Sequence, residues 1–283
     1  MHSAIDVPTM LIQPSSAAHI AASIPDGALL AIPKTAAGVS MAVTRELVRR
    51  GARNLHLVGI PTSGLQADIL IGAGCVSVIE TSAVTLGEFG TGPRFAAAVR
   101  AGSVEVRDAT CPAIYAALQA GVKGIPFIPL RGLIGTDVLN RRSDWKVIDN
   151  PFEQDDPIAL LPAIRPDVAL FHAVRADRHG NVYIGREREL MMMAHAARTT
   201  FVTVEEIVDA DLMAEGSSAA ATVASLYVEQ IALAPRGAWP LALLDRYALD
   251  ADVVGEYAKL ARTEDGFRNF LDSWLGIEQG EAA

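Results

Sequence analysis

The sequence predicts an α/β fold in which a mostly parallel sheet is flanked by helices. From Ile24 onward, short β-rich apolar runs alternate with segments whose apolar residues have helical spacing. Glycine or proline stands at many of the boundaries between these segments, where turns and helix ends favour them. The chain has 283 residues, 51% hydrophobic and 20% charged, so it is long and apolar enough to bury a core.

The first half of the chain shows this alternation most clearly. We expect strands at Ala28–Ile32, Leu55–Val58, Val76–Glu80, Val104–Val106 and Phe127–Leu130. Helices are expected between them, at Gly38–Arg50, Leu65–Ile71, Pro93–Val99 and Pro112–Ala120. This order is typical of strands joined by crossover helices.

The second half continues the pattern with one interruption. Strands are expected at Val168–Phe171, Val182–Ile184 and Thr200–Val204, and an outer strand at Trp145–Ile148. The segment Pro151–Pro162 is rich in Asp and Pro and marks either an insertion or a seam between subdomains. We expect one domain over residues 1–283, with a helical carboxyl-terminal portion at about 243–275.

Composition narrows the classes of function. There are 24 Lys and Arg against 33 Asp and Glu, a formal charge of −9, and Arg49-Arg50 and Arg141-Arg142 are isolated basic pairs. Such an acidic chain is not expected to bind nucleic acid or a membrane surface. Two cysteines cannot build a disulfide framework, and the amino terminus has no apolar secretory region. No apolar run reaches the length of a membrane span, so we expect a cytoplasmic location.

Glycine-rich turns at strand ends are the first candidates for a binding site. Pro33-Lys-Thr-Ala-Ala-Gly38 follows a strand and precedes a helix, whose amide end attracts anions. Lys34, Thr35 and Gly38 are therefore candidate binding residues, although an ordinary strand-to-helix loop explains them as well. Gly72-Ala-Gly74 lacks the spacing of a dinucleotide fingerprint and is interpreted as glycines that pack between a helix and a strand.

A polar strand end lies at Thr81–Gly92, directly beyond a predicted strand. It carries Ser82, Thr85 and Glu88, and parallel sheets place their ligand crevices at such ends. Glu88 is equally explained as a charge that complements the positive end of the next helix. Glu88 therefore has two possible roles, one at a binding site and one at the helix end.

The remaining reactive residues favour structural roles. No two of the six histidines have the helical spacing of a metal pair, and His172 is expected to be a hydrogen-bonded structural histidine more often than a catalytic one. Met191-Met192-Met193 indicates a helix core. Glu205-Glu206 is interpreted as a solvated helix start. No hydrolase or nucleotide-phosphate motif is present.

The segment Arg165–Tyr183 carries the most information on function. It predicts a buried strand, a turn at Asp177–Asn181 and a second strand. Its pattern of Pro-Asp-Val-Ala-Leu, His-Ala, Ala-Asp and Gly-Asn resembles the core of the family I coenzyme A transferases, specifically the alpha subunit of the glutaconate CoA-transferase type. Three further stretches resemble the same subunits, and the likeness covers most of the chain from Ile24 to Tyr247. They are Gly124–Asp137, Thr203–Val208 and Val228–Pro240.

The resemblance implies a composite site. Alpha and beta subunits of that family share a fold, and the beta subunit carries the glutamate that becomes a CoA thioester. The expected motif Ser-Glu-Asn-Gly is absent here, so the nucleophile is expected on a partner polypeptide, with no catalytic residue and no metal in this chain. Glu88 falls where related alpha chains show a Gly-Glu pair. Related ring-opening hydrolases use an acidic residue where this chain has Cys111, which counts against ring hydrolysis.

The hypothesis is therefore an alpha subunit of a heteromeric CoA-transferase, active only with a beta subunit. A coenzyme A thioester and a small carboxylic acid would be its substrates, with no tightly bound cofactor. Lys34, Thr35 and Gly38 would shape one wall, Ser82, Thr85 and Glu88 would meet the acyl carboxylate, and Phe127 to Arg131 would line the crevice. Lys34 or Arg131 would supply a cation for a second carboxylate. The alternatives are a CoA-thioester hydrolase of the same fold and a non-catalytic or ligand-sensing subunit.

Overall fold

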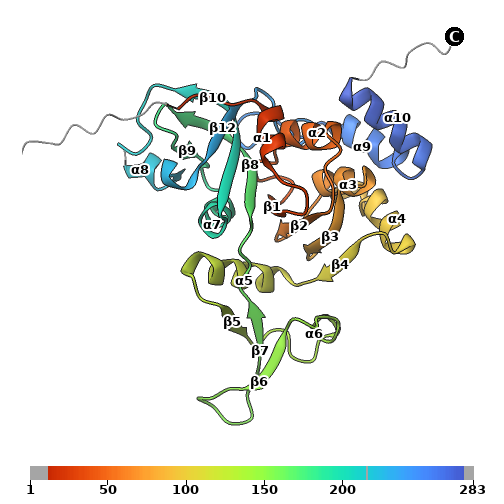
Figure 1. The fold of residues 1–283 in the computed structure, drawn as a ribbon, viewed down its shortest axis with the longest axis vertical. Coiled ribbons are helices and arrows are strands. Elements are labelled where there is room, and N and C mark those ends of the chain that lie inside the picture. Colours follow the sequence, from red (N-terminus) through yellow and green to blue (C-terminus); the bar gives the residue numbers. More distant parts are fainter. Residues whose placement is uncertain (1–11, 215, 277–283) are drawn as a thin grey trace, which may run out of the picture.

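A mostly parallel nine-stranded sheet forms the centre of the molecule and confirms the predicted fold class (Figure 1). The structure is a computed structural model and describes residues 12–214 and 216–276. The expectation about an amino-terminal signal therefore falls mostly on residues outside the described part. Within the described part, no helix combines the length and the apolar character needed to cross a membrane.

The main sheet has the strand order β4-β3-β2-β1-β8, and β10 and β12 continue it beyond β8. All of these pairs are parallel. The far half of β8 also forms an antiparallel pair with β9, which in turn pairs with β11. The strands of the main sheet are β1 Leu29–Pro33, β2 Leu55–Ile60, β3 Val76–Thr81, β4 Glu105–Asp108, β8 Val168–Asp177, β9 Val182–Tyr183, β10 Thr199–Val208, β11 Thr222–Val223 and β12 Gln230–Leu233.

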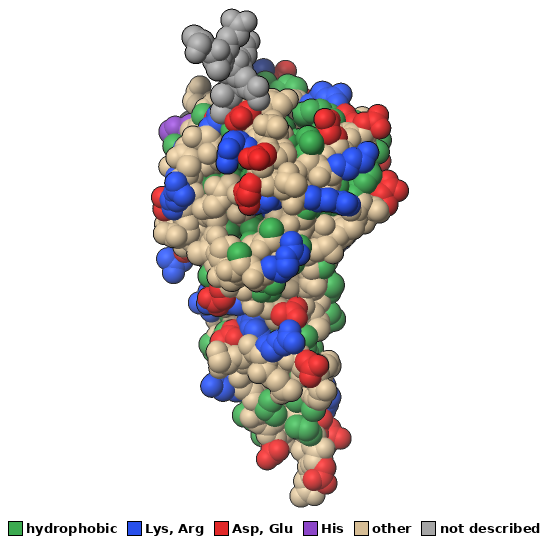
Figure 2. Space-filling model, turned by 90° about the vertical axis from the view of Figure 1, so that its right-hand side faces the viewer, with side chains coloured by type: hydrophobic (Ala, Val, Ile, Leu, Met, Phe, Trp, Pro, Cys, Tyr) green, Lys and Arg blue, Asp and Glu red, His purple; other side chains and the backbone are tan. Residues whose placement is uncertain are grey.

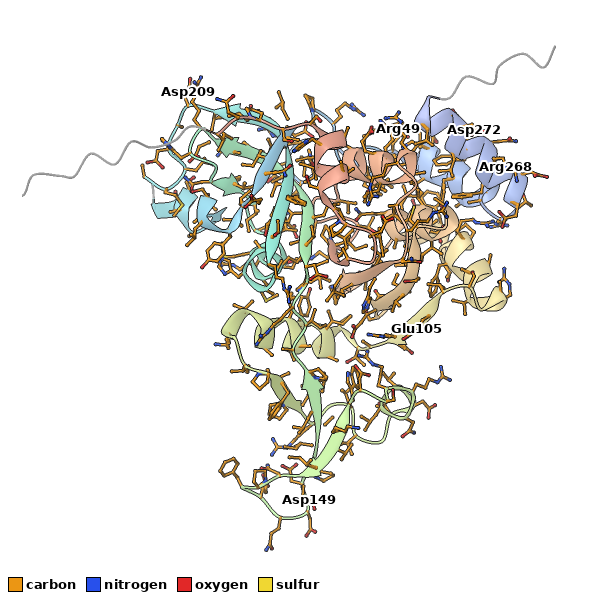
Figure 3. All side chains as sticks on the ribbon, in the orientation of Figure 1. Arg49, Glu105, Asp149, Asp209, Arg268 and Asp272 are labelled. Atoms are coloured by element: carbon orange, nitrogen blue, oxygen red, sulfur yellow. The ribbon has the colours of Figure 1, made fainter. Side chains whose placement is uncertain are left out.

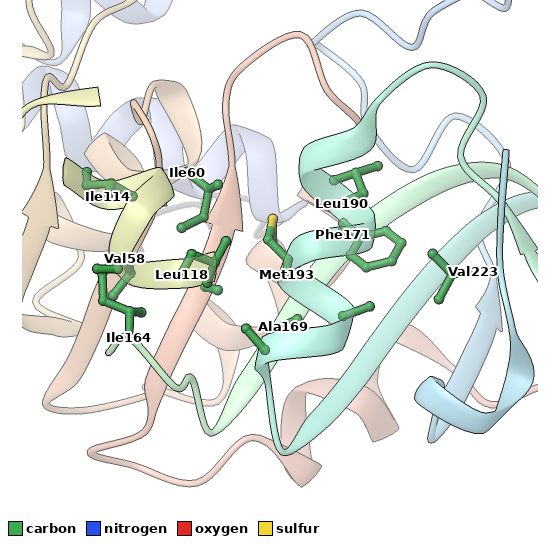
Figure 4. Close-up of a cluster of buried hydrophobic side chains, with 14 of the residues drawn as sticks. Val58, Ile60, Ile114, Leu118, Ile164, Ala169, Phe171, Leu190, Met193 and Val223 are labelled. Atoms are coloured by element: carbon green, nitrogen blue, oxygen red, sulfur yellow. The ribbon is translucent and has the colours of Figure 1, made fainter. Parts of the chain in front are cut away.

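Helices cover both faces of this sheet, because its central strands, such as β1 and β8, are apolar on both sides. On one face, Leu118 of α5, Met193 of α7 and Phe171 of β8 belong to one apolar cluster, which Figure 4 shows. On the other face, α1, α2 and α3 bury a second apolar cluster. The helices are α1 Ala17–Ser23, α2 Met41–Arg49, α3 Leu65–Gly72, α4 Pro93–Ala101, α5 Cys111–Lys123, α6 Asp137–Arg141, α7 Arg188–Ala196 and α8 Gly216–Ala219, with short 3₁₀ turns η1 Gly87–Phe89 and η2 Ser225–Tyr227.

The carboxyl-terminal portion is helical, as expected, and forms an outer layer. Helices α9 (Ala251–Leu260) and α10 (Glu264–Leu275) pack on α2 and α3 through a third apolar cluster. The Tyr257 hydroxyl donates a hydrogen bond to Asp68 Oδ2 at 2.6 Å inside this cluster, which ties α9 to α3. Gly72 packs against Phe267 of α10, so this glycine does serve packing, although a helix and not a strand is its neighbour.

A second, three-stranded antiparallel sheet was not predicted. It consists of β5 (Phe127–Leu130), β6 (Lys146–Asp149) and β7 (Pro157–Pro162), with β7 in the middle. Phe127–Leu130 and Lys146–Asp149 are strands, but the expectation that Phe127–Leu130 continues the parallel alternation was wrong. The Asp- and Pro-rich segment contains the hairpin loop and the central strand of this small sheet.

The small sheet forms a narrow lobe next to α5 (Figure 1). Figure 2 shows hydrophobic side chains on the surface of this lobe and acidic ones toward its tip. Asp149 lies near the tip, at the opposite end of the molecule from Arg49 and Asp272 (Figure 3). Phe152, in the hairpin loop, is 96% exposed. Several large hydrophobic side chains of the lobe are therefore exposed to solvent.

The loop between β1 and α2 is held against β8 at one glycine. Gly38 has φ +77°, and a Cβ atom there would lie 2.0 Å from the His172 carbonyl oxygen. The His172 amide also donates a hydrogen bond to Gly38 O at 2.7 Å. Only a residue without a side chain fits this close approach at a left-handed φ.

Replacing Gly38 by alanine should therefore destabilise the fold strongly. We expect Gly38→Ala to lower the free energy of unfolding by about 2–4 kcal/mol, since it adds steric overlap to left-handed strain. Gly27→Ala is the matched control, because Gly27 has φ +79° and no atom within 4 Å of an added Cβ. It should cost only about 1 kcal/mol. Equal losses in urea denaturation would contradict the close-approach argument.

Candidate active site at the carboxyl edge of the sheet

Three loops meet at the carboxyl ends of β1, β2 and β3, where open parallel sheets bind their ligands. Gly64 is their meeting point, because a Cβ atom on it would lie 2.0 Å from Thr35 Oγ1 and 2.9 Å from Thr85 O. The Ser63 amide donates to Ala83 O at 2.8 Å, which joins the second loop to the third. The structure thus brings the loops that contain Thr35 and Thr85 together, as expected for one site.

Lys34 lies at this edge, but its charge is already balanced. Its ammonium forms ion pairs with Glu189 of α7 and with Glu187, the latter at 3.6 Å, and its side chain is 39% exposed. Partial burial alone would lower the pKa of Lys34, but the hydrogen bond and charge of Glu189, with Glu187, raise it. Lys34 is therefore protonated at neutral pH and fixes the loop to α7. Sequence reasoning missed both glutamates, because they lie about 150 positions away along the chain.

A thiol and a hydroxyl stand side by side next to this lysine loop. Cys111 begins α5, and its Sγ lies 3.2 Å from Ser82 Oγ, which also donates to Pro61 O at 2.9 Å. One turn further along α5, partial burial and the charge of Glu189 raise the pKa of Tyr115, so its phenol stays protonated. The edge therefore offers a half-buried set of neutral hydrogen-bonding groups beside a paired cation.

Thr85 and Glu88 lie in the third loop, at the rim. Thr85 Oγ1 accepts a hydrogen bond from the Gly87 amide at 3.2 Å and lies 3.4 Å from Gly90 O, so the hydroxyl mainly stabilises its own turn. Glu88 is exposed on η1, and no ion pair holds its carboxylate among the described residues. Contact of either residue with substrate stays a prediction.

Phe127 and Arg131 do not lie with these loops, and their contact with substrate stays a prediction. Both belong to the small-sheet lobe and line a separate, largely apolar cavity of about 650 Å³. Arg131 pairs with Asp156 at 2.6 Å and with Glu153 at 3.1 Å. Sequence reasoning placed them at the edge because it assigned their strand to the main sheet.

A buried polar network lies behind the edge, between β8 and β10. The His172 ring is fully buried, with Nδ1 2.8 Å from Thr203 Oγ1 and Nε2 2.7 Å from Glu205 Oε1. Burial lowers the pKa of His172 despite the nearby carboxylate. A carboxylate only accepts, so the neutral ring donates from Nε2 to Glu205 and accepts from Thr203. The hydrogen-bonded role expected for His172 agrees with these contacts.

Glu205 lies inside strand β10, so its interpretation as a solvated helix start was wrong. Its carboxylate accepts hydrogen bonds from His172, from the Tyr247 hydroxyl at 2.7 Å and from the Arg236 amide at 2.8 Å. Partial burial would raise the pKa of Glu205, but these hydrogen bonds hold it at about 2. The network fixes the loop at 235–240 over the ends of β8 and β10. No local signal in the sequence identifies partners this far apart.

The described residues contain no group of three or more His, Cys, Asp or Glu side chains placed to hold a metal ion. The edge offers backbone amides, hydroxyls, one thiol, one phenol, a paired lysine and the carboxylates of Glu88, Glu187 and Glu189. Such a set can bind and orient a carboxylic acid or thioester.

The parallel sheet and the loops at its carboxyl edge define the class: an α/β protein whose candidate site is formed by loops at the carboxyl ends of parallel strands. Residues 15–234 match the family model described as Coenzyme A transferase, and the chain belongs to this family. It is 31% identical to the A subunit of the 3-oxoadipate CoA-transferase from Pseudomonas knackmussii. The alignment extends over 257 residues and covers 88% of each chain. The solved glutaconate coenzyme A-transferase of Acidaminococcus fermentans superposes with a TM-score of 0.85 at 25% identity, over 95% of this chain and 90% of that one. The predicted resemblance is thus confirmed.

Two further relatives broaden the comparison. A protein of Archaeoglobus fulgidus is 34% identical over 84% of this chain, and the chain spans about half of its length (53%). A Rhodococcus jostii protein named cholesterol ring-cleaving hydrolase IpdA subunit is 28% identical over 83% of this chain and 82% of that one. Family membership therefore fixes the fold and leaves the reaction to be proposed.

The hydrogen bonds to Glu205 give a testable acid sensitivity. Because folding lowers the pKa of Glu205 from 4.5 to about 2, its stabilising effect is complete above pH 4.5 and is lost as the pH falls toward 2. Glu205→Gln should lower the free energy of unfolding at pH 7 by about 1–3 kcal/mol, since it weakens hydrogen bonds to a charged acceptor. It should also flatten the loss of stability between pH 4.5 and 2, measured by thermal unfolding.

Glu206→Gln is the matched control on the same strand. Glu206 pairs with Arg246 at the surface, with side chains 43% and 36% exposed, and such pairs contribute little. Its unfolding curves should parallel those of the unchanged protein. If the unfolding curves of Glu205→Gln also parallel those of the unchanged protein, the stabilising role of the hydrogen-bond network is contradicted.

Proposed function

We propose that this chain is the alpha subunit of a heteromeric CoA-transferase, which moves CoA between an acyl-CoA and a carboxylic acid. The observation that carries the proposal is the meeting of three strand-end loops around Gly64, in a family member similar to the A chain of a known transferase. A partner polypeptide provides the reactive glutamate. This glutamate takes the CoA thiol as a thioester while the first acid leaves, and the carboxylate of the second acid then takes the CoA and frees the glutamate.

The charges at the edge support a nucleophile from elsewhere. Glu187 and Glu189 are both paired with Lys34, and Glu80, close to the end of β3, is buried against Arg142 at 2.8 Å. A carboxylate in such a pair is held away from an incoming thioester. Glu88 is the exception, because it is exposed and unpaired among the described residues, and we assign it to contact with the substrate and the nucleophilic role to the partner.

The covalent step is testable by mass spectrometry. The chain is mixed with an acyl-CoA and with its partner beta subunit, without acceptor acid, and the intact polypeptides are weighed after rapid quenching. We expect the mass of bound CoA on one glutamate of the partner and none on this chain. An active complex that never shows this adduct would rule out the proposed mechanism.

A second candidate is CoA-thioester hydrolysis, which the likeness to a ring-cleaving hydrolase subunit favours. In that case water replaces the acceptor acid. Turnover of the acyl-CoA by the complex without any added carboxylic acid would support hydrolysis, whereas strict dependence on the acid supports transfer.

Lys34 is best assigned as a positioning residue for the first loop. Because Glu187 and Glu189 already neutralise its ammonium, it is not a free cation for a second substrate carboxylate. Lys34→Gln should lower kcat/KM by roughly 10-fold, as expected for losing one charged hydrogen bond, and equally for monocarboxylate and dicarboxylate acceptors. Lys123→Gln, an exposed change at the end of α5, is the control. A loss confined to dicarboxylates would instead make Lys34 their binding residue.

A further inference from the structure

A second pocket lies on the outer side of the β1–α2 connection. It has a volume of about 280 Å³ and forms where α2 meets the loop after β12. The Ala42 amide donates to Gly237 O at 2.9 Å and holds the two walls together. The pocket is lined by Ala42, Arg45, Pro235, Arg236, Gly237 and Trp239.

The pocket contains two guanidinium groups that no acidic side chain pairs with in the described part of the chain. Arg45 Nε is buried and has no hydrogen-bond partner, and the guanidinium stacks 4.9 Å from the Trp274 ring centroid. The Arg236 guanidinium lies 5.5 Å from the Tyr247 ring centroid. Both groups are thus oriented by aromatic rings and not by carboxylates.

The carboxylates close to the pocket are already engaged. Glu46 pairs with Arg49, and Glu205 accepts three hydrogen bonds. Asp250 accepts from the Trp239 indole at 3.0 Å and from a backbone amide at 3.2 Å. Two guanidinium groups without a carboxylate partner among the described residues therefore lie at one pocket, in a chain whose net charge is −9.

The backbone around Arg236 is built to hold this arrangement. Arg236 has φ +57°, which is uncommon for a residue with a side chain, and its amide is fixed to Glu205. A Cβ atom at Gly237 would lie 2.7 Å from the His172 ring. Burial, and the charge of Arg49, lower the pKa of Arg45, so its charge gains from an anionic neighbour. The same network that fixes the carboxyl edge thus fixes this pocket.

We propose that Arg45 and Arg236 bind a phosphate group of a ligand whose flat or apolar part lies against Trp239. Guanidinium groups match the oxygens of phosphate in a planar, bidentate way, and an indole offers a stacking face. Resting on the proposed function, we assign the phosphate to the nucleotide end of the CoA thioester. Free phosphate is the other source of this chemistry.

Direct binding tests the site without any catalysis. Calorimetric titration of the purified chain with adenosine 3′,5′-bisphosphate should show binding that Arg45→Gln and Arg236→Gln each weaken at least 10-fold. Arg198→Gln removes the same charge at the amino end of β10, where the side chain is 79% exposed, and should change nothing. Far-ultraviolet circular dichroism confirms that each variant is folded. Equal affinity in the folded Arg45 and Arg236 variants would overturn the site.

The transfer assay separates the sources of the phosphate. In the complex with its partner, both variants should raise KM for an acyl-CoA at least 10-fold and leave KM for the matching acyl-pantetheine unchanged. If inorganic phosphate binds as tightly as the bisphosphate while KM for acyl-CoA stays constant, the assignment to CoA is wrong. A complex that transfers nothing contradicts the proposed function instead, and the titration still decides whether the two arginines bind phosphate.

Discussion

The buried hydrogen-bond chain through His172 is the constraint on which both ends of the site depend. Ser40, Thr203, His172 and Glu205 follow one another at 2.7–2.8 Å from the start of α2 to the far side of β10. Water cannot replace a lost partner for a ring that is fully buried, so each member has to keep its neighbour. Since the network reaches the loop at 34–40 on one side and the loop at 235–240 on the other, it fixes the distance between the two.

This constraint explains why glycines stand at its two contacts with backbone. Gly38 lies against the carbonyl of His172, and Gly237 lies against its ring. A side chain at either position would push a loop away from β8 and break the network from outside. The close approach of two loops to the buried imidazole of His172 therefore determines the shape of this edge of the sheet. The residues that face solvent have less influence on it.

The sequence predicted those strands and helices that short local segments determine. Strands β1 and β2 are short apolar runs followed by a turn and a helix, and the repetition of this order as far as β4 indicates a parallel sheet. It did not predict which sheet Phe127–Leu130 joins, because a four-residue run carries no information on its pairing partner. Pro157–Pro162 was hidden for a related reason, since proline at both ends made a central strand look like a loop.

The candidate site divides in the same way. Lys34, Thr35, Gly38, Ser82 and Thr85 could be placed at one edge from the sequence because strand ends in a parallel sheet meet there, which follows from topology alone. Glu189, Glu205 and Arg236 were missed because their meaning arises only when segments 150 or more residues from the first loop fold onto it. Long-range ion pairs have no period or motif, so no single-sequence pattern reveals them.

The carboxyl edge and the outer pocket differ in their distribution of charge. At the carboxyl edge, Glu187 and Glu189 hold the one lysine, and hydroxyl and thiol groups lie in the loops beside it. At the outer pocket the balance is reversed, because the neighbouring carboxylates are bound elsewhere and two guanidinium groups are left unmatched. The proposed ligand, which has an uncharged thioester at one end and phosphates at the other, would match this difference in charge. An acidic surface can then repel anions in general while still admitting one that carries its charges at the correct end.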